Sequence, residues 1–599
     1  MKNCNIDRLN KQKGNLRKEI YTGENDTYFK VIDLECGTGK SRNTMEILAD
    51  NCDENIHKYL YVVERNADAI ESAKRINLLA NKTIAIAVNK DTYNRKEFNN
   101  IKNKLNTYRV VIISHEKYKA LAIDKINRKY FTDGRNTLII DEFLNMAKGN
   151  ELVLYIDYLH WLETSLYHRA LRNTFAECIS EIEDYLLSEK PMQSFFNAKV
   201  KFNYISKKIN HLKKLIDTNL TQEYCNGLKY NDDNIPYTKQ RLLREIDNIK
   251  QFYNQTCVVE GNTMYCIDRS YQYWLLNNNI MLDASGKLNM AYKLNDIFQL
   301  QHQTQVLDHH QWSFFISKTN TCASAKARAL NFYETVNKMV DINGIDNTLV
   351  IGNKNDELSI KANYKNHYGN ITGSNEYKDL SNIIITHNPN LPYRQYVLEY
   401  LYYSNKKLTN KNKWCGSRVG SGDSQVYRFK EDKFEEYRQC YNANQIYQAI
   451  KRINRNMELN SIVFIFNNDS EMIDRVMKMF KGDYKFKEYD NKIKFEKSKQ
   501  EEYNEDRKEN RQAMKFILLC KEIIKLKHID LQTTKKNRKH EDIIQEGIYS
   551  KDKIREFMQI KNKSNFTNKV LNDAEVIAYC SKHNIIVNTR TLDFTQYIK

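Results

Sequence analysis

Short apolar runs alternate with amphipathic stretches through the first 150 residues. Strand-sized runs lie at 29–33, 59–63, 83–88, 110–113 and 137–140. Charged helical stretches such as 68–79 separate these runs, and strands that alternate with helices predict a parallel α/β sheet covered on both faces. We therefore expect a first α/β domain at 29–150, preceded by a polar lead-in segment at 1–28 that shows no clear periodicity.

The pattern changes after residue 150. Residues 151–275 carry long amphipathic segments, which predict an inserted helical domain. Apolar β-type residues return at 280–282, so 276–300 is expected to complete the first domain and 301–496 to form a second α/β domain. The strands predicted for the second domain lie at 312–316, 348–351, 383–385 and 461–466.

Residues 497–599 are charged and helical in pattern. Three short basic helices are expected, at 550–557, just after 565–568 and at 574–583, and the apolar run 585–587 follows them. This order favours a helix-turn-helix or winged-helix module that could hold duplex DNA. A helical cap with a purely structural role fits the same pattern equally well.

The overall charge favours a polyanionic partner. The 599 residues include 94 Lys and Arg against 75 Asp and Glu, a formal charge of +19. The chain is also rich in Asn, Lys, Ile and Tyr with only four prolines, a bias that AT-rich coding produces by itself, so the charge is weak evidence for function.

Cysteine usage and hydropathy narrow the class of protein. The 12 cysteines include no Cys-x-x-Cys pair, which argues against a zinc ribbon, and no secretory leader is evident, so reduced thiols are expected. No apolar run approaches the roughly 18 residues that span a bilayer. We expect a cytoplasmic protein of a bacterial or phage-infected cell that does not enter membranes.

A glycine-containing loop between a strand and a helix carries the clearest chemistry. It comprises Cys36, Gly37, Thr38, Gly39, Lys40 and Ser41. Glycines let backbone N–H groups face an anion, Lys40 can reach the β- and γ-phosphates, and Ser41 can bind Mg²⁺. The loop thus predicts an ATP site, with Leu34 standing where the strict pattern has its first glycine. Cys36 is interpreted as a small residue that fits, rather than as a redox switch.

A second acidic motif lies about a hundred residues later. The predicted strand at 137–140 ends in Asp141 and Glu142. Adjacent carboxylates at the end of a strand can divide their roles, with Asp141 holding Mg²⁺ through water and Glu142 orienting and deprotonating the attacking water.

With these two motifs the chain resembles the superfamily 2 helicases of the DEAD/DEAH-box type, which implies two tandem RecA-like domains. Asp283-Ala284-Ser285-Gly286 resembles motif III of that family, and Gly373-Ser374-Asn375-Glu376 resembles motif V, which places Gly373 and Asn375 near the nucleotide. Residues 448–455 resemble motif VI, with Lys451 and Asn454 in place of its two glycines.

Motif VI implies catalytic residues supplied by the second domain. Arg452 and Arg455 are three residues apart, so on one face of a helix both could reach the γ-phosphate as arginine fingers, and Gln448 begins the motif.

Nucleic-acid contacts are predicted at the ends of strands and in loops. Arg65, Ser114 and Lys117 occupy the positions of motifs Ia and Ib, Ser285 belongs to motif III, and Arg418 lies in the glycine-bearing stretch 416–422. Ordinary loop residues, and for 416–422 a flexible connector, are the alternative interpretation.

The resemblance implies a nucleic-acid-dependent ATPase that uses ATP and Mg²⁺ to translocate on or unwind nucleic acid, with DNA favoured over RNA. A phage or plasmid replication helicase that meets other replication proteins would suit the composition. Two other hypotheses stay open: a terminase-type packaging ATPase, and a replication-initiation protein that binds DNA and uses nucleotide as a switch.

Overall fold

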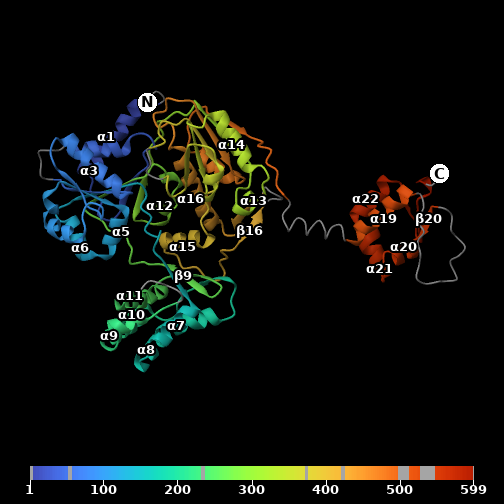
Figure 1. The fold of residues 1–599 in the computed structure, drawn as a ribbon, viewed down its shortest axis with the longest axis horizontal. Helices are drawn as coiled ribbons and strands as arrows, with labels where there is room; N and C mark the ends of the chain where they lie inside the picture. The colour runs from blue at the N-terminus through green and yellow to red at the C-terminus, as the bar shows by residue number, and fades with distance from the viewer. Residues whose placement is uncertain are drawn as a thin grey trace. The chain divides into compact units, whose positions relative to one another are not determined.

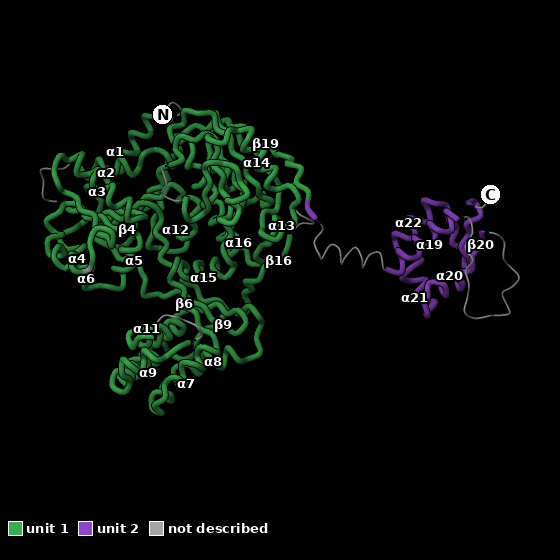
Figure 2. The backbone as a smooth tube through the Cα atoms, viewed as in Figure 1, with its two compact units in different colours: residues 1–494 green, residues 495–599 purple. Residues whose placement is uncertain are grey.

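The computed structural model describes residues 4–50, 57–230, 237–371, 376–419, 425–496, 511–526 and 547–597. The chain divides into two compact units, unit 1 at residues 1–494 and unit 2 at residues 495–599 (Figure 2). Unit 1 contains two parallel sheets, which confirms the predicted α/β class with two sheet domains.

The first sheet has seven parallel strands in the order β11-β1-β10-β5-β2-β4-β3. The strands are β1 (Phe29–Ile32), β2 (Tyr59–Val63), β3 (Ala85–Ala87), β4 (Val110–Ser114), β5 (Thr137–Asp141), β10 (Asn278–Leu282) and β11 (Phe298–Gln301). Because all seven run in one direction, their carboxyl ends meet at one edge of the sheet. The loops after β1, β2, β4, β5 and β10 therefore come together although they are far apart in sequence.

Helices cover both faces of this sheet. One face packs on α1 (Ile6–Thr22), α2 (Lys40–Asp50) and α3 (Asn66–Ala80). The other face packs on α5 (His115–Ile123), α6 (Lys125–Thr132) and α12 (Ala291–Leu294). The remaining elements of this part are α4 (Arg95–Ile101), η1 (Lys102–Thr107) and η3 (Gly286–Leu288).

Helix α1 lies within the segment expected to be a polar lead-in. Leu9, Leu16 and Ile20 are buried, and Leu16 and Ile20 belong to the core of the first domain. The helix is also tied to that domain by Tyr21, whose hydroxyl donates to the carbonyl of Ile47. The hydrophobic pattern did not indicate this helix, because its few apolar positions are separated by charged and polar residues.

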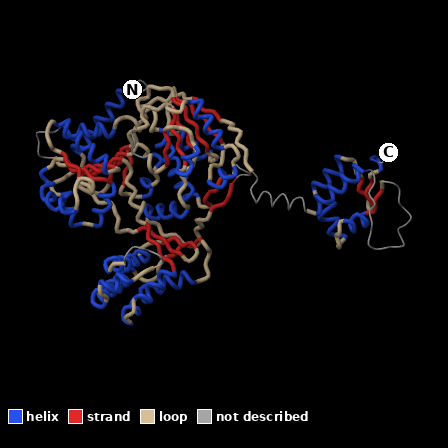
Figure 3. Tube along the Cα trace, viewed as in Figure 1, coloured by secondary structure: helices blue, strands red, loops and turns tan. Residues whose placement is uncertain are grey.

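The insertion is not purely helical, which corrects the expectation for 151–275. It contains a four-stranded antiparallel sheet in the order β6-β9-β8-β7, red beside its helices in Figure 3. The strands are β6 (Glu151–Tyr155), β7 (Gln193–Phe196), β8 (Cys257–Glu260) and β9 (Thr263–Ile267). The helices are α7 (Ile156–Ser165), α8 (Arg169–Leu187), α9 (Phe202–Asn219), α10 (Gln222–Gly227) and α11 (Lys239–Ile249), followed by η2 (Lys250–Tyr253).

The second sheet has six parallel strands in the order β14-β13-β15-β18-β12-β19. The strands are β12 (Trp312–Ser317), β13 (Thr348–Gly352), β14 (Tyr364–His367), β15 (Asn382–Ile385), β18 (Ser461–Phe466) and β19 (Lys485–Glu488). Around them lie α13 (Ala323–Arg328), α14 (Phe332–Asn343), η4 (Lys354–Ser359), α15 (Tyr393–Ser404), α16 (Asp432–Ile450) and α17 (Ser470–Met477). A hairpin of β16 (Gly416–Val419) and β17 (Val426–Phe429) precedes α16.

The antiparallel sheet of the insertion packs against α15, so the insertion of the first domain contacts the second domain (Figure 1). Arg394 at the start of α15 pairs with Glu151 (3.2 Å) and Glu260 (3.0 Å) and lies over the ring of Tyr265. Trp414 is buried and donates its indole N–H to the carbonyl of Ser194. The insertion therefore links the two sheet domains.

Unit 2 combines helices with a small antiparallel sheet of order β20-β22-β21. Its elements are α19 (Gln512–Leu526), β20 (Ile548–Ser550), α20 (Lys551–Phe557), α21 (Lys563–Phe566), η6 (Thr567–Leu571), α22 (Ala574–Lys582), β21 (Ile586–Val587), β22 (Thr591–Asp593) and η7 (Thr595–Tyr597). Helices α20 and α22 match the predictions at 550–557 and 574–583, whereas the helix expected after 565–568 instead covers 563–571. The sheet is an addition to the expectation.

Hydropathy in the described part of the chain gives no candidate membrane span, because no helix there is both long and apolar enough.

The packing of α1 predicts a measurable contribution to stability. Leu16→Ala should lower the free energy of unfolding by about 2–5 kcal/mol because it removes a fully buried side chain from the core. The matched control is Ile6→Ala in the same helix, where the side chain is exposed and the change should stay within about 0.5 kcal/mol. Chemical denaturation of both variants would show equal small effects if α1 did not belong to the folded domain.

Candidate functional site

The glycine loop after β1 turns sharply at the carboxyl edge of the first sheet. Gly37 and Gly39 have φ values of +91° and +80°, in the left-handed region that side chains other than glycine rarely adopt. Thr38 is buried and bonds back to the carbonyl of Glu35 through its hydroxyl (2.7 Å). Helix α2 begins at Lys40, so the loop leads directly into a helix N-terminus, with Ser41 in its first turn.

Lys40 lies between the two carboxylates that follow β5. Its ammonium donates to Glu142 Oε1 (2.6 Å) and lies 3.4 Å from Asp141 Oδ1. Burial alone would lower the pKa of Lys40, but these carboxylates raise it above its ordinary value. Burial would likewise raise the pKa of Glu142, yet Lys40, Arg452 and Arg455 hold it below its ordinary value. The lysine and Glu142 are therefore a charged pair in this structure.

Asp141 has the surroundings of a ligand for a hard cation. Its Oδ2 accepts a hydrogen bond from the hydroxyl of Tyr61 (3.0 Å), and its buried Oδ1 has no hydrogen-bond donor among the described residues. No group of three or more His, Cys, Asp or Glu residues gathers as a metal site within those residues. So small a number of protein oxygen donors fits Mg²⁺, which keeps several waters and is bound through one or two protein oxygens plus substrate phosphates. Asp141 and Ser41 would be those ligands.

The segment after β10 connects the first domain to the second. Buried Asp283 accepts from the hydroxyls of Ser285 (2.7 Å) and Tyr292 (2.8 Å). Ser285 in turn accepts a hydrogen bond from Gln448 Nε2 at 3.0 Å. Two of the predicted site residues, from motifs III and VI, thus meet directly across the domain boundary.

Arg452 and Arg455 do not lie on a helix, which corrects the prediction from their spacing. Helix α16 ends at Ile450, and Asn454 has a φ of +41°, a left-handed conformation that Asn tolerates better than most residues. The Asn454 amide donates to the carbonyl of Leu459 and the hydroxyl of Ser461. Asn454 therefore supplies the turn that a glycine would otherwise make.

This turn lies against the glycine loop that follows β1. A Cβ on Gly37 would come within 3.5 Å of the carbonyl oxygen of Arg455. Arg452 is buried, and the charges of both arginines lower the pKa of Glu142 across the domain boundary. Both arginines therefore lie near Glu142 from the second domain, and their role as arginine fingers stays a prediction. Lys451 instead points into the second domain, where its ammonium bonds His309 and lies over the ring of Trp312.

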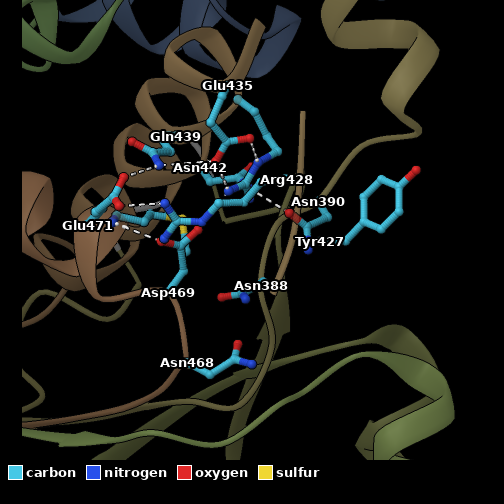
Figure 4. A network of polar contacts seen from close by, with 12 residues as sticks. Asn388, Asn390, Tyr427, Arg428, Glu435, Gln439, Asn442, Asn468, Asp469 and Glu471 are labelled. Carbon is cyan, nitrogen blue, oxygen red and sulfur yellow. Dashed lines mark hydrogen bonds and ion pairs between the residues drawn. The ribbon is translucent and has the colours of Figure 1, made fainter. Parts of the chain in front are cut away.

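A buried polar network anchors α16 (Figure 4). Arg438 of α16 pairs with Glu435 (2.5 Å) and with Asp469 (2.6 Å), and Arg428 of β17 also pairs with Asp469 (3.0 Å). Gln439 donates to Glu471 at the start of α17. The network joins the hairpin, α16 and α17 into one block, so the helix that carries Gln448 is held at its other end.

A cavity of about 830 Å³ lies between the two sheet domains. Its walls come from the carboxyl ends of β2, β4 and β5 on one side, and from those of β13, β14 and β15 together with α16 on the other. The cationic side chains on its walls are Arg65, Lys119, Lys148 and Lys354. Glu142 and Gln448 also line it, so the cavity communicates with the site around Lys40.

The predicted nucleic-acid contacts fall into different places. Arg65 lines the cavity, Ser114 is buried at the end of β4, and Ser285 bridges the domains. Lys117 is not among the cavity residues: its ammonium lies over the rings of Phe98 and Phe131, and burial lowers its pKa. Arg418 is exposed on β16 and is not among the cavity residues.

Lys119, unlike Lys117, lines the cavity, where its ammonium donates to Glu116 (3.0 Å) and to the carbonyl of Lys148 (3.1 Å). His115 and Lys119 both line the cavity, and the two are four residues apart in α5, on the same face. Helical spacing counted from the start of α5 could have identified this pair. Gly373 and Asn375 of the motif V prediction lie outside the described residues.

Glu64 at the end of β2 predicts a pH-dependent contribution to stability. Burial and the nearby charge of Glu142 raise its pKa to about 7. The folded protein binds the Glu64 proton more tightly than the unfolded chain does. The stability that this proton contributes is therefore fully present below about pH 4.5 and is lost as pH rises through 7. In urea unfolding, the free energy of unfolding of wild type should fall relative to that of Glu64→Gln by up to about 1.4 kcal/mol per pH unit between pH 5 and 7. A difference that stays constant with pH would contradict the assignment.

Comparisons with known proteins give only distant likenesses. No protein-family model and no curated protein matches the sequence. Among solved structures, Xpd4 of S. tokodaii is 10% identical with a TM-score of 0.45, and the match covers 80% of this chain and 100% of that one. Dbp5 of S. cerevisiae bound to RNA and ADP BeF3 is 9% identical with a TM-score of 0.34, over 80% and 89%. The DUF1998 helicase MrfA bound to DNA and AMPPNP is 9% identical with a TM-score of 0.34, over 80% and 51%.

Proposed function

We propose that this protein is a nucleic-acid-dependent ATPase of the helicase type, in which ATP binds between the two sheet domains of unit 1. The observation that carries the proposal is the convergence around Lys40. The phosphate loop, Asp141 and Glu142 come from the first domain, and Arg452 and Arg455 face them from the second. No fold-level likeness is needed for this assignment, because the residue types and their placement are those of phosphoryl transfer.

The chain's own residues divide the chemistry. Backbone N–H groups of the turn at Gly37 and Gly39, together with the N-terminus of α2, hold the phosphates. Lys40 exchanges its pairing with Glu142 for the β- and γ-phosphates. Glu142, so released, orients the attacking water and accepts its proton. Mg²⁺ held by Ser41 and Asp141 would neutralise developing charge on the phosphate oxygens.

Arg452 and Arg455 make hydrolysis depend on the closed arrangement. Guanidinium groups stabilise the charge that develops on the transferred phosphoryl group, and such arginines contribute about 10³–10⁵ in rate. Both arginines belong to the second domain, so the site is complete only when the domains are together. The hydrogen bond from Gln448 to Ser285 also joins the two domains, so it belongs to the same closed arrangement.

The cavity is the proposed path of the nucleic acid. Arg65, Lys119, Lys148 and Lys354 place cations from both domains on its walls, among the carboxylates of Glu64, Glu116, Glu142 and Glu399. These cations would contact a phosphodiester backbone that crosses the domain boundary. Glu142 lines this cavity and also pairs with Lys40, so one residue contacts both sites. A strand bound there would be gripped differently in open and closed arrangements, which is the basis of translocation.

Steady-state ATP hydrolysis with and without single-stranded DNA or RNA tests the function. Nucleic acid should stimulate wild type, and Lys40→Ala or Glu142→Gln should lower the stimulated kcat by about 10²-fold or more because each removes a group that acts on the phosphates or the water. Strand binding should survive in both variants. Lys338→Ala, an exposed residue of α14, is the matched surface control and should hydrolyse like wild type.

Hydrolysis that is equally fast with and without nucleic acid would overturn the helicase-type assignment. Slow hydrolysis that no strand stimulates, together with tight nucleotide binding, would instead favour a nucleotide-switched DNA-binding protein.

A further inference from the structure

Unit 2 has a helical surface, at residues 563–569, that exposes basic and neutral polar side chains. Helix α21 continues without a break into η6, a π-helical segment, which gives nine helical residues from 563 to 571. Phe566 and Val570 point into the core of unit 2, where the ring of Phe566 meets that of Phe516 in α19 at 6.0 Å. Packing by these residues fixes the opposite face of the helix toward solvent.

The solvent-facing side chains are all basic or neutral hydrogen-bonding groups. They are Lys563, Ser564, Asn565, Thr567, Asn568 and Lys569. The whole stretch 557–572 contains three lysines and no carboxylate. Helix α22, by contrast, exposes Glu575 and Ile577 beside a single lysine, Lys582. The face at 563–569 is therefore better suited to phosphates and base edges than the exposed face of α22.

We propose that the α21–η6 face binds duplex DNA by entering the major groove. The major groove of B-form DNA admits an α-helix, whereas the major groove of A-form RNA is too narrow for one. Lys563 and Lys569 would contact phosphates, and the Asn565 and Asn568 amides have the donor and acceptor pair that reads adenine. The exposed face contains no aromatic side chain on which unpaired bases could stack, so it fits a duplex better than a single strand.

Existing contacts leave this face available. Lys563 pairs with Asp552 at 3.3 Å, but both side chains are exposed and such pairs contribute little. Asn568 donates to the hydroxyl of Ser564 at 3.2 Å, a contact within the same face. The side-chain amide of Asn565 has no hydrogen-bond partner among the residues that the structure describes.

Charge reversal on the full-length protein tests the surface. Without nucleotide, Lys563→Glu with Lys569→Glu should weaken binding of a labelled 20-base-pair DNA duplex at least tenfold. The slope of log Kd against log salt concentration should fall by about two, one for each lost phosphate contact. The matched control, Lys521→Glu with Lys525→Glu, changes the net charge equally on two exposed lysines of α19 and should bind within twofold of wild type.

Three further measurements keep the proposal separate from the ATPase. The α21–η6 variant should retain hydrolysis stimulated by single-stranded DNA, and Lys40→Ala should bind the duplex like wild type. If the glutamate variant fails to fold, Lys563→Gln with Lys569→Gln should still weaken duplex binding by severalfold. Duplex binding that falls equally in the control, or that is unchanged in the α21–η6 variants, would overturn the proposal. Preference for an RNA duplex would overturn it as well.

Discussion

The buried ion pair between Lys40 and Glu142 depends on the parallel direction of the first sheet. Parallel strands bring the ends of β1, β5 and β10 to one edge, so an ammonium at the start of α2 meets carboxylates about a hundred residues later in the sequence. Lys40 is the buried partner and Glu142 is about a quarter exposed, so removing Glu142 would leave the buried ammonium with Asp141 as its remaining carboxylate partner. In the proposed function a phosphate group takes the place of Glu142 beside Lys40, so the same lysine would serve first a structural contact and then binding.

The second domain is held against this edge by contacts along its length. Gln448 bonds Ser285, the backbone of Arg455 lies beside Gly37, and Glu35 accepts from the backbone N–H groups of Val306 and Leu307. The insertion adds a further connection because its sheet packs on α15. The first domain thus contacts the second both at the proposed nucleotide site and through the insertion, with the cavity between the sheets.

The local hydrophobic pattern predicted the strands around the site. Elements that depend on pairing between distant segments of the chain could not be predicted in this way. Strands β2, β4 and β5 are largely apolar runs and β1 is interrupted only by Lys30, so their ends and the motifs that follow them could be predicted. The insertion sheet could not, because β6 pairs with β9 more than a hundred residues away and both are short. Motif VI showed which residues face the site but not their conformation, since the left-handed φ of Asn454 ends the helical spacing. Within α5 the helical periodicity places Lys119, and not Lys117, on the cavity wall.

Coupling between the nucleotide site and the cavity is the central claim, and equilibrium binding tests it most directly. In Glu142→Gln, which should bind Mg²⁺ and ATP without turning it over, the affinity for a labelled single strand should change severalfold when ATP is added. Linkage requires that the strand change the affinity for ATP by the same factor, and replacing Arg452 and Arg455 by alanine should reduce that factor toward one. Equal strand affinity with and without ATP would contradict the account, because the two sites would then be independent.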